Sequence, residues 1–222
     1  MTRHTTLGFH DRRDGGQALA HALLQRRGWS DPVVLALPRG GVPVAFEVAT
    51  VLDAPLDVLV VRKIGHPRHE EFAIGAIASG GVTVMNDRGD RYLGGVRADE
   101  VARIVARERA ELARREAAYR DGTPVPVQGR EVILVDDGLA TGATMRAATA
   151  AVRQRNPASI TVAVPVGAAE TCDALRPLAD DVVCACIPER FRAVGEWYEE
   201  FPQTSDDEVH DLLARARRMV TG

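Results

Sequence analysis

Short apolar runs alternate with amphipathic stretches along most of this 222-residue chain. The apolar runs are rich in Val, Ile and Leu and end at Gly, Pro or Asp, a pattern typical of buried strands. These predicted strands are Val33–Leu37, Asp57–Val61, Val132–Val135, Ile160–Val166 and Asp181–Ile187. Apolar residues at helical spacing predict helices at Asp11–Arg27, Val42–Leu52, Arg97–Arg120, Met145–Arg155, Ala168–Leu178 and Asp206–Met219. Alternating strands and helices predict an α/β fold, an open and mostly parallel sheet flanked by helices on both faces.

Two stretches depart from this alternation. Phe72–Asn86 alternates in polarity and carries Gly80-Gly81, which predicts two strands joined by a turn. Arg97–Arg120 is highly charged with a narrow apolar stripe, so this helix is expected to pack on one neighbour or on a partner subunit. The pattern predicts one domain, 1–222, with a core at about 30–187, a helical insertion at about 97–120, and a hood with a closing helix at about 188–219.

The strand Val132–Val135 ends in two acids, Asp136 and Asp137, named the acid pair here. A loop and a predicted helix follow; this Gly/Thr loop consists of Gly138, Leu139, Ala140, Thr141, Gly142, Ala143 and Thr144. Backbone N–H groups at a helix start and threonine hydroxyls suit a phosphate. A carboxylate about 4 Å from a phosphate oxygen would be repelled by roughly 4 kcal/mol at an effective dielectric near 20. The acid pair should therefore bind hydroxyls or a divalent cation, and a ribose 5-phosphate would satisfy both parts of the motif.

The whole run V-I-L-V-D-D-G-L-A-T-G-A-T-M resembles the motif with which type I phosphoribosyltransferases bind 5-phosphoribosyl 1-pyrophosphate (PRPP). The resemblance implies that the acid pair holds the ribose 2- and 3-hydroxyls and that Ala140–Thr144 holds the 5-phosphate. It also implies the fold of that family with a small C-terminal or N-terminal hood, and Mg²⁺ as a cofactor. A P-loop and a dinucleotide-binding fingerprint are excluded because neither glycine pattern is present. A receiver-like module or another phosphosugar-binding module is the alternative from the acids alone.

Two further stretches resemble parts of the same family. Pro38-Arg39-Gly40-Gly41, named the Arg-Gly-Gly loop, follows the first predicted strand and resembles the family's pyrophosphate loop. The resemblance implies pyrophosphate contacts from Arg39 and from the N–H groups of Gly40 and Gly41, and a cis peptide bond into Arg39. Lys63 is the only lysine of the chain, and Arg62-Lys63 resembles the pair that adenine and orotate phosphoribosyltransferases place beside pyrophosphate. A solvated strand end is the alternative for this pair.

The segment Pro188–Gln203, named the aromatic tail, carries four aromatic side chains. Its run F-R-A-V-G-E-W-Y-E-E-F loosely resembles the base-cradling stretch of hypoxanthine-guanine phosphoribosyltransferases. The resemblance implies that Phe191 and Trp197 offer a stacking surface and that the backbone around Val194 reads the ring edge. Glu196 stands where that family has a second aromatic residue, so the resemblance does not extend to the identity of the base. A core role for these aromatic residues is the alternative.

Composition narrows the class of protein. A net charge of −3 and a pI of about 6.1 do not indicate a nucleic-acid-binding face. No apolar run approaches the ~20 residues of a membrane span, and the polar N-terminus lacks a signal-peptide core, so a cytoplasmic protein is expected. Three cysteines do not make a disulfide framework, and Cys184 and Cys186 are expected to be buried free thiols. His66 and His69 could bind a metal, although a mobile loop is favoured at that position.

These observations predict an Mg²⁺-dependent phosphoribosyltransferase. It would move the 5-phosphoribosyl group of PRPP to a ring nitrogen of a nucleobase-like acceptor and release pyrophosphate. Asp136, Asp137, Lys63 and Arg39 are expected to serve the reaction, and no metal ligand is assigned. A homodimer is compatible with the half-solvated helix at 97–120. The alternative is a non-catalytic PRPP- or nucleotide-sensing regulator on the same fold.

Overall fold

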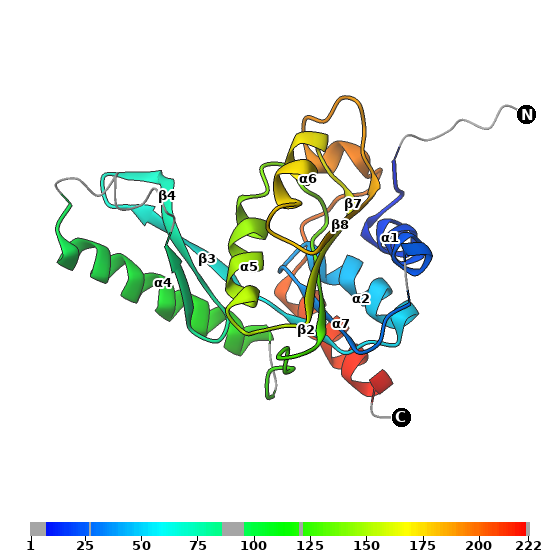
Figure 1. Cartoon of the computed structure of the whole chain (residues 1–222), viewed down its shortest axis with the longest axis horizontal. Coiled ribbons are helices and arrows are strands. Elements are labelled where there is room, and N and C mark those ends of the chain that lie inside the picture. Colours follow the sequence, from blue (N-terminus) through cyan, green and yellow to red (C-terminus); the bar gives the residue numbers. More distant parts are fainter. Residues whose placement is uncertain (1–7, 27, 86–95, 120–121, 221–222) are drawn as a thin grey trace, which may run out of the picture.

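The computed structural model describes residues 8–26, 28–85, 96–119 and 122–220, which form two sheets and their flanking helices (Figure 1). A five-stranded sheet has the order β2-β1-β6-β7-β8, and a three-stranded sheet has the order β3-β4-β5. The strands are β1 Pro32–Ala36, β2 Leu56–Val58, β3 Val61–His66, β4 His69–Ala78, β5 Val82–Met85, β6 Glu131–Val135, β7 Ser159–Val166 and β8 Asp181–Cys186. The helices are α1 Arg12–Arg26, α2 Gly41–Leu52, α4 Ala98–Tyr119, α5 Ala143–Arg153, α6 Ala169–Leu175, the 3-10 turn η1 Val194–Trp197 and α7 Asp206–Val220.

The main sheet is parallel throughout and is covered on both faces, as predicted. Helices α1, α2 and α7 lie on one face, and α5 and α6 lie on the other (Figure 1). In β6, Ile133 and Val135 belong to the core beneath α2, whereas Val132 and Leu134 belong to the core beneath α5. A strand buried on both faces needs apolar residues at every position, which is why it reads as a continuous apolar run.

The register of the main sheet brings separate loops to one edge. Ala36 of β1 lies beside Val135 of β6, and Val135 lies beside Ala163 of β7. The Arg-Gly-Gly loop after β1 and the acid pair after β6 therefore leave the same, C-terminal edge of the sheet, where ligands bind in open parallel sheets.

The predicted strand Asp57–Val61 is wrong in its extent. Strand β2 ends at Val58, and the chain then leaves the main sheet and enters the antiparallel sheet as β3, where Val61 pairs with Ala78. Ser79 fixes this bend, since its Oγ accepts from the Val60 N–H (2.8 Å) and its N–H donates to the Val60 carbonyl (2.9 Å). Apolar periodicity does not reveal a change of sheet, because both halves of the run are buried.

The antiparallel sheet and α4 form an arm that extends away from the main sheet (Figure 1). Ile64, Ile74 and Ile77 are fully buried in the same core as Leu112 and Tyr119 of α4. The predicted turn at Gly80-Gly81 is confirmed, and both glycines have positive φ, 81° and 76°. The first strand of that predicted pair begins earlier than expected, at His69, and the prediction for Asn86 lies outside the described residues.

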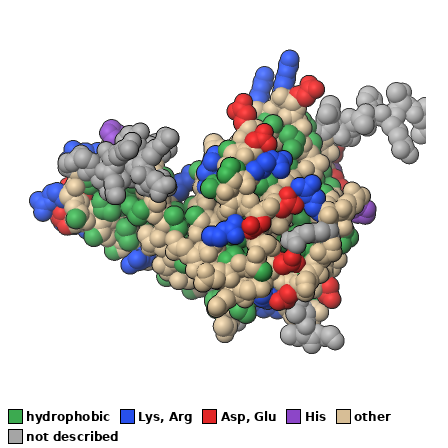
Figure 2. Space-filling view, in the orientation of Figure 1, with side chains coloured by type: hydrophobic (Ala, Val, Ile, Leu, Met, Phe, Trp, Pro, Cys, Tyr) green, Lys and Arg blue, Asp and Glu red, His purple; other side chains and the backbone are tan. Residues whose placement is uncertain are grey.

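The arm also has an apolar outer surface. Figure 2 shows hydrophobic side chains gathered on its visible face. The predicted homodimer stays a prediction, since this surface alone does not identify a partner. No helix within the described ranges has the length and apolar character needed to cross a bilayer.

The aromatic tail lies against the segment that precedes α1. The Phe9 N–H donates to the Trp197 carbonyl (2.8 Å), and the Glu199 N–H donates to the Phe9 carbonyl (2.9 Å). The segment before α1 and the aromatic tail thereby meet beside the C-terminal edge of the main sheet. Helix α7 then returns across α2, with Val209 and Leu213 buried.

Candidate functional site

The acid pair lies directly after the central strand β6. The Asp137 N–H donates to Oδ1 of Asp136 at 2.9 Å, which fixes the first carboxylate against the backbone of the second. Burial raises the pKa of Asp136 well above its usual range, and the neighbouring Asp137 charge raises it further. Within the described residues no cationic side chain forms an ion pair with Asp136. This carboxylate is therefore suited to a ligand that brings hydroxyl donors or positive charge.

Asp137 has a cationic partner that the sequence did not indicate. Arg12, at the start of α1, places Nε and Nη2 each at 2.9 Å from Oδ2 of Asp137. Burial raises the pKa of Asp137, while the Arg12 charge and hydrogen bond act in the opposite direction. The Tyr198 hydroxyl donates to the Asp137 carbonyl at 2.6 Å. In a chain with 28 basic residues, nothing in the local sequence distinguishes Arg12.

The Arg-Gly-Gly loop packs directly on the acid pair. A side chain at Gly40 would collide with Oδ2 of Asp137, and one at Gly41 would come within 2.7 Å of the Val135 carbonyl. The predicted cis peptide bond between Pro38 and Arg39 is confirmed. The Gly41 N–H donates to the Leu37 carbonyl (3.1 Å), so it is already engaged in this structure.

Arg39 itself lies 3.7 Å from Oδ1 of Asp206, the first residue of α7. The Tyr119 hydroxyl, at the end of α4, donates to the same oxygen at 2.8 Å. Arg39 is therefore paired across the loop to α7, and a pyrophosphate contact from its guanidinium stays a prediction.

The Gly/Thr loop presents backbone donors at the start of α5. Within the described residues, the N–H groups from Ala140 to Thr144 have no hydrogen-bond partner. Gly142 has φ 69°, a left-handed conformation that favours glycine. Thr171 of α6 supports the loop from behind, because its hydroxyl donates to the Ala140 carbonyl at 2.6 Å. Such a cluster of free donors at a helix N-terminus suits an anion.

Leu139 is a core residue within that loop. Its side chain is 2% exposed, its N–H donates to the Val166 carbonyl (2.9 Å), and its carbonyl accepts from the Ala168 N–H (3.0 Å). Leu139 therefore anchors the loop to β7, and its predicted contact with substrate has no free polar group to make it.

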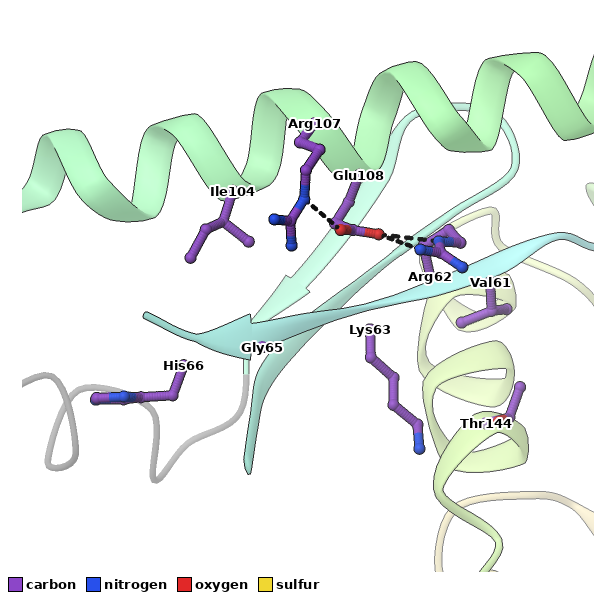
Figure 3. Close-up of a pocket in the computed structure, with 9 residues that line it drawn as sticks. All are labelled: Val61, Arg62, Lys63, Gly65, His66, Ile104, Arg107, Glu108 and Thr144. Carbon is purple, nitrogen blue, oxygen red and sulfur yellow. Dashed lines mark hydrogen bonds and ion pairs between the residues drawn. The ribbon is translucent and has the colours of Figure 1, made fainter. Parts of the chain in front are cut away.

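The Arg62-Lys63 pair is split between two faces of β3, as successive strand residues must be. Arg62 points to α4, where its Nε and Nη2 lie 2.9 and 2.7 Å from Oε2 of the buried Glu108. Lys63 extends toward the first turn of α5 and Thr144 (Figure 3). Because β2 ends at Val58 and these residues belong to β3, the two side chains have different neighbours, and the contact of both with pyrophosphate stays a prediction.

A pocket of about 420 Å³ lies between the arm and the start of α5. Its lining includes Lys63, Thr144 and His66 together with the Arg62–Glu108 ion pair (Figure 3). Lys63 is solvent-exposed and has no partner within the described residues, so it is the free cation of this pocket. The predicted approach of Lys63 to a ligand on the Gly/Thr loop is compatible with this position.

Different residues of the aromatic tail contact different parts of the molecule. Val194 packs on the Gly/Thr loop, since a side chain at Gly138 would come within 2.5 Å of its Cγ1. Trp197 is half-buried, and its Nε1 has no hydrogen-bond partner among the described residues. Phe191, near the start of the aromatic tail, is half-buried. The sequence suggested no role for Tyr198 or Phe201. In the structure, the Tyr198 hydroxyl donates to the Asp137 carbonyl, and the Arg12 guanidinium lies over the Phe201 ring.

The remaining predicted groups lie elsewhere. His66 and His69 flank the β3–β4 turn with ring centroids 5.5 Å apart, and the described residues contain no group of three side chains able to hold a metal ion. The three cysteines are free, as predicted, but only Cys172 is buried; Cys184 and Cys186 are half-buried.

Comparisons with known proteins identify the family of this chain. The family model described as "Phosphoribosyl transferase domain" matches residues 10–207. The protein TT1426 from Thermus thermophilus, whose crystal structure is known, superposes with a TM-score of 0.84 at 43% identity over 94% of this chain and 98% of that one.

Two curated proteins of Mycobacterium tuberculosis, MT0597 and Rv0571c, are each 48% identical over 214 residues, and their names give phosphoribosyl transfer as a proposed activity. The match covers 95% of this chain and 47% of each relative, so the chain spans about half the length of the curated relatives it matches. Because the family model covers nearly the whole chain, from the helix that carries Arg12 to the start of α7, the chain belongs to the phosphoribosyl transferase domain family.

Proposed function

We propose that this chain binds PRPP and transfers its 5-phosphoribosyl group to a ring nitrogen of a nucleobase-like acceptor, with release of pyrophosphate. One observation carries the proposal. A pair of half-buried carboxylates and a helix start with free backbone donors follow each other on one strand–loop–helix unit. Carboxylates accept hydrogen bonds from a ribose diol, and free N–H groups donate to a phosphate, so the two sites match the two ends of a ribose 5-phosphate.

The side chains around C1 of the ribose would act by position and charge. Asp136 and Asp137 would hold the 2- and 3-hydroxyls, and the N–H groups from Ala140 to Thr144 would hold the 5-phosphate. Arg39 and Lys63 would approach the pyrophosphate and stabilise the charge that develops on it as it leaves. Holding both ends of the sugar turns the transfer into a reaction between pre-oriented groups. No side-chain nucleophile is needed.

Mg²⁺ is part of the proposal through the substrate. The described residues include no cluster of three metal-ligating side chains, and Mg²⁺ in proteins is often held by substrate phosphates together with few protein ligands. Among the described residues Arg12 is the one cation that pairs with the acid pair, and the remaining negative charge suits a substrate that carries Mg²⁺. Such a metal would supply positive charge to the pyrophosphate, while Asp136 and Asp137 would hold the diol.

The acceptor would lie over C1, beneath the aromatic tail. Val194 touches the Gly/Thr loop at Gly138, so the neighbouring backbone would lie close to a sugar held by that loop. Phe191 is half-buried and its ring would offer a stacking surface, a contact worth about 1–3 kcal/mol per base. Phe191→Ala is expected to raise the KM for the acceptor with little change in PRPP binding.

The test is a calorimetric titration with PRPP and Mg²⁺, followed by a screen for PRPP-dependent pyrophosphate release across nucleobases and other ring-nitrogen acceptors. Asp136→Asn and Asp137→Asn together should weaken PRPP binding at least about tenfold, because charge-assisted hydrogen bonds are worth roughly 1.5–3 kcal/mol each. Asp173→Asn, on the exposed face of α6, is the matched control. Unchanged binding in the double variant would refute the proposal. Tight binding without release for any acceptor would favour the alternative, a PRPP-sensing regulator.

A further inference from the structure

Arg12 belongs to a closed ring of contacts around Asp137. Its guanidinium lies 2.9 Å from Oδ2 of Asp137 and 3.7 Å from the centroid of the Phe201 ring. Phe201 stacks on Tyr198 with centroids 4.9 Å apart, and the Tyr198 hydroxyl returns to the Asp137 carbonyl at 2.6 Å. The second acid of the acid pair is thus fixed at its side chain by the first helix and at its backbone by the aromatic tail.

The guanidinium is itself immobilised. Its Nη1 donates to the Pro202 carbonyl at 2.6 Å, and only 11% of the Arg12 side chain is exposed, against 17% of Asp137. A charge pair with so little solvent around it is screened weakly, so its geometry strongly constrains both partners. Arg12 is held on three sides and acts as a rigid support.

The contact is confined to one carboxylate oxygen. Both nitrogens of Arg12 approach Oδ2, and the Gly40 backbone abuts the same oxygen, whereas Oδ1 of Asp137 accepts no hydrogen bond from another described residue. The arrangement turns Oδ2 toward the protein and leaves Oδ1 for a ligand. It also offsets part of the repulsion between Asp137 and Asp136, whose carboxylates are adjacent.

We propose that Arg12 is a positioning residue for sugar recognition: it orients Asp137 so that Oδ1 receives a ribose hydroxyl, and thereby sets the preference for a sugar with an intact diol. The inference rests on the proposed function, since it assigns the diol to the acid pair. Arg12 does not touch the substrate in this arrangement. A role limited to joining α1 to the aromatic tail would affect stability but not the choice between sugars.

The experiment compares two ligands that share the phosphate. Ribose 5-phosphate and 2,3-dideoxyribose 5-phosphate both suit the Gly/Thr loop, but only the first has the diol. The wild-type chain is expected to bind ribose 5-phosphate at least about tenfold more tightly, consistent with one or two hydrogen bonds to charged groups. Arg12→Gln should reduce that ratio to about threefold or less, with the affinity for the dideoxy sugar nearly unchanged.

Two further variants complete the test. Arg26→Gln removes another ion pair of α1, with Asp181, at the far end of the helix and should leave the ratio unchanged. Arg12→Lys keeps the charge but not the two-nitrogen contact, so its ratio should lie between those of Arg12→Gln and the wild type. This variant also decides the question if Arg12→Gln does not fold. A full wild-type ratio in either Arg12 variant would overturn the role of Arg12. A wild-type ratio near one would instead refute the assignment of the diol to the acid pair, and with it the proposed function.

Discussion

At the scale of single residues, the acid pair shows how neighbours with the same side chain acquire different properties. Asp137 is paired with Arg12, whereas Asp136 has the Asp137 N–H and no cation within the described residues. Burial and the adjacent charge therefore raise the pKa of Asp136. A site that must receive a polar ligand keeps such an uncompensated group at a cost in stability.

This cost in stability predicts how the stability of an Asp136 variant changes with pH. An aspartate whose pKa is raised in the folded protein binds its proton more tightly there than in the unfolded chain, where the pKa is about 3.9. Its contribution to stability is complete below about pH 4 and is lost as the pH rises through the folded-state pKa. Asp136→Asn should therefore raise the melting temperature at pH 7.5 by about 2–4 °C, equivalent to roughly 1 kcal/mol in a chain of this size. The gain should shrink toward about pH 4.

Asp180 is the control, because its pKa is shifted in the opposite direction to that of Asp136. Burial alone would raise its pKa, but the hydrogen bond from the Ile160 N–H and the pairing with Arg153 lower it overall. Asp180→Asn should therefore destabilise the protein at neutral pH, and the difference should disappear as the pH falls. Differential scanning calorimetry between about pH 4 and 8 measures both variants. Equal pH dependence in the two would contradict the assignment.

A substitution at Gly40 gives a second prediction at this scale. Its φ and ψ of −60° and −31° suit any residue, so an alanine there introduces no backbone strain. The added methyl group would collide with the Asp137 carboxylate. Gly40→Ala should displace Asp137 from Arg12, weaken PRPP binding at least about tenfold and cost about 1–3 kcal/mol of stability. Gly28→Ala, where no atom lies within 4 Å of the added group, should change neither quantity.

At the scale of elements, β3 connects the arm to the site through two residues that face opposite ways. Arg62 and the buried Glu108 join β3 to α4, and Lys63 faces the start of α5. The arm therefore has an internal electrostatic anchor on one face and a free cation on the other. Two neighbouring residues of one strand therefore have different roles: Arg62 packs against α4, and Lys63 is available to a ligand.

This division predicts different effects for two similar substitutions. Arg62→Met leaves Glu108 buried with only the more exposed Arg107 as a partner among the described residues, and should destabilise the protein by about 1–3 kcal/mol. Lys63→Met changes an exposed side chain and should leave stability within about 0.5 kcal/mol, while lowering the affinity for PRPP. Urea denaturation and calorimetric titration measure the two properties. A loss of PRPP affinity limited to Arg62→Met would reverse the assignment.

At the scale of the whole molecule, the start of α1 and the aromatic tail, which are far apart in the chain, meet at the acid pair. The segment around Phe9 pairs with the aromatic tail, and Arg12 and Tyr198 approach Asp137 from those two segments. The proposed ligand site is thus supported by contacts between distant segments. Ligand binding is therefore expected to affect the segment around Phe9 and the aromatic tail as well as the loops.

Amide hydrogen exchange tests this coupling. Saturating ribose 5-phosphate should slow exchange at residues 8–16 and 191–201 as well as at 138–144, because local opening of the ends would disturb Asp137. Strand β5, at the edge of the arm's sheet, is the internal reference. Protection limited to 138–144 would show that segments 8–16 and 191–201 are independent of the site.

The sequence indicated the alternation of strands and helices and a mostly parallel main sheet, and the structure confirms both. It also proposed the acid pair and the Gly/Thr loop as the centre of a ligand site. Each follows from local chemistry: buried strands need apolar runs, and a phosphate loop needs glycines and donors at consecutive positions. The family resemblance extended this to the cis bond before Arg39, which the structure confirms. Leu139 was misjudged because motif position alone does not show which loop residues turn into the core.

The way in which distant residues combine is set by tertiary packing. The bend after Val58 depends on Ser79, and the separate fates of Arg62 and Lys63 depend on Glu108 of α4. The role of Arg12 depends on Asp137, which is 125 positions away in the chain. A side chain of this kind has no local pattern to reveal it, since its energy comes from a partner and a solvent exposure that exist only after folding. Local pattern indicated where a ligand would bind, and packing between distant segments determines which side chains support that place.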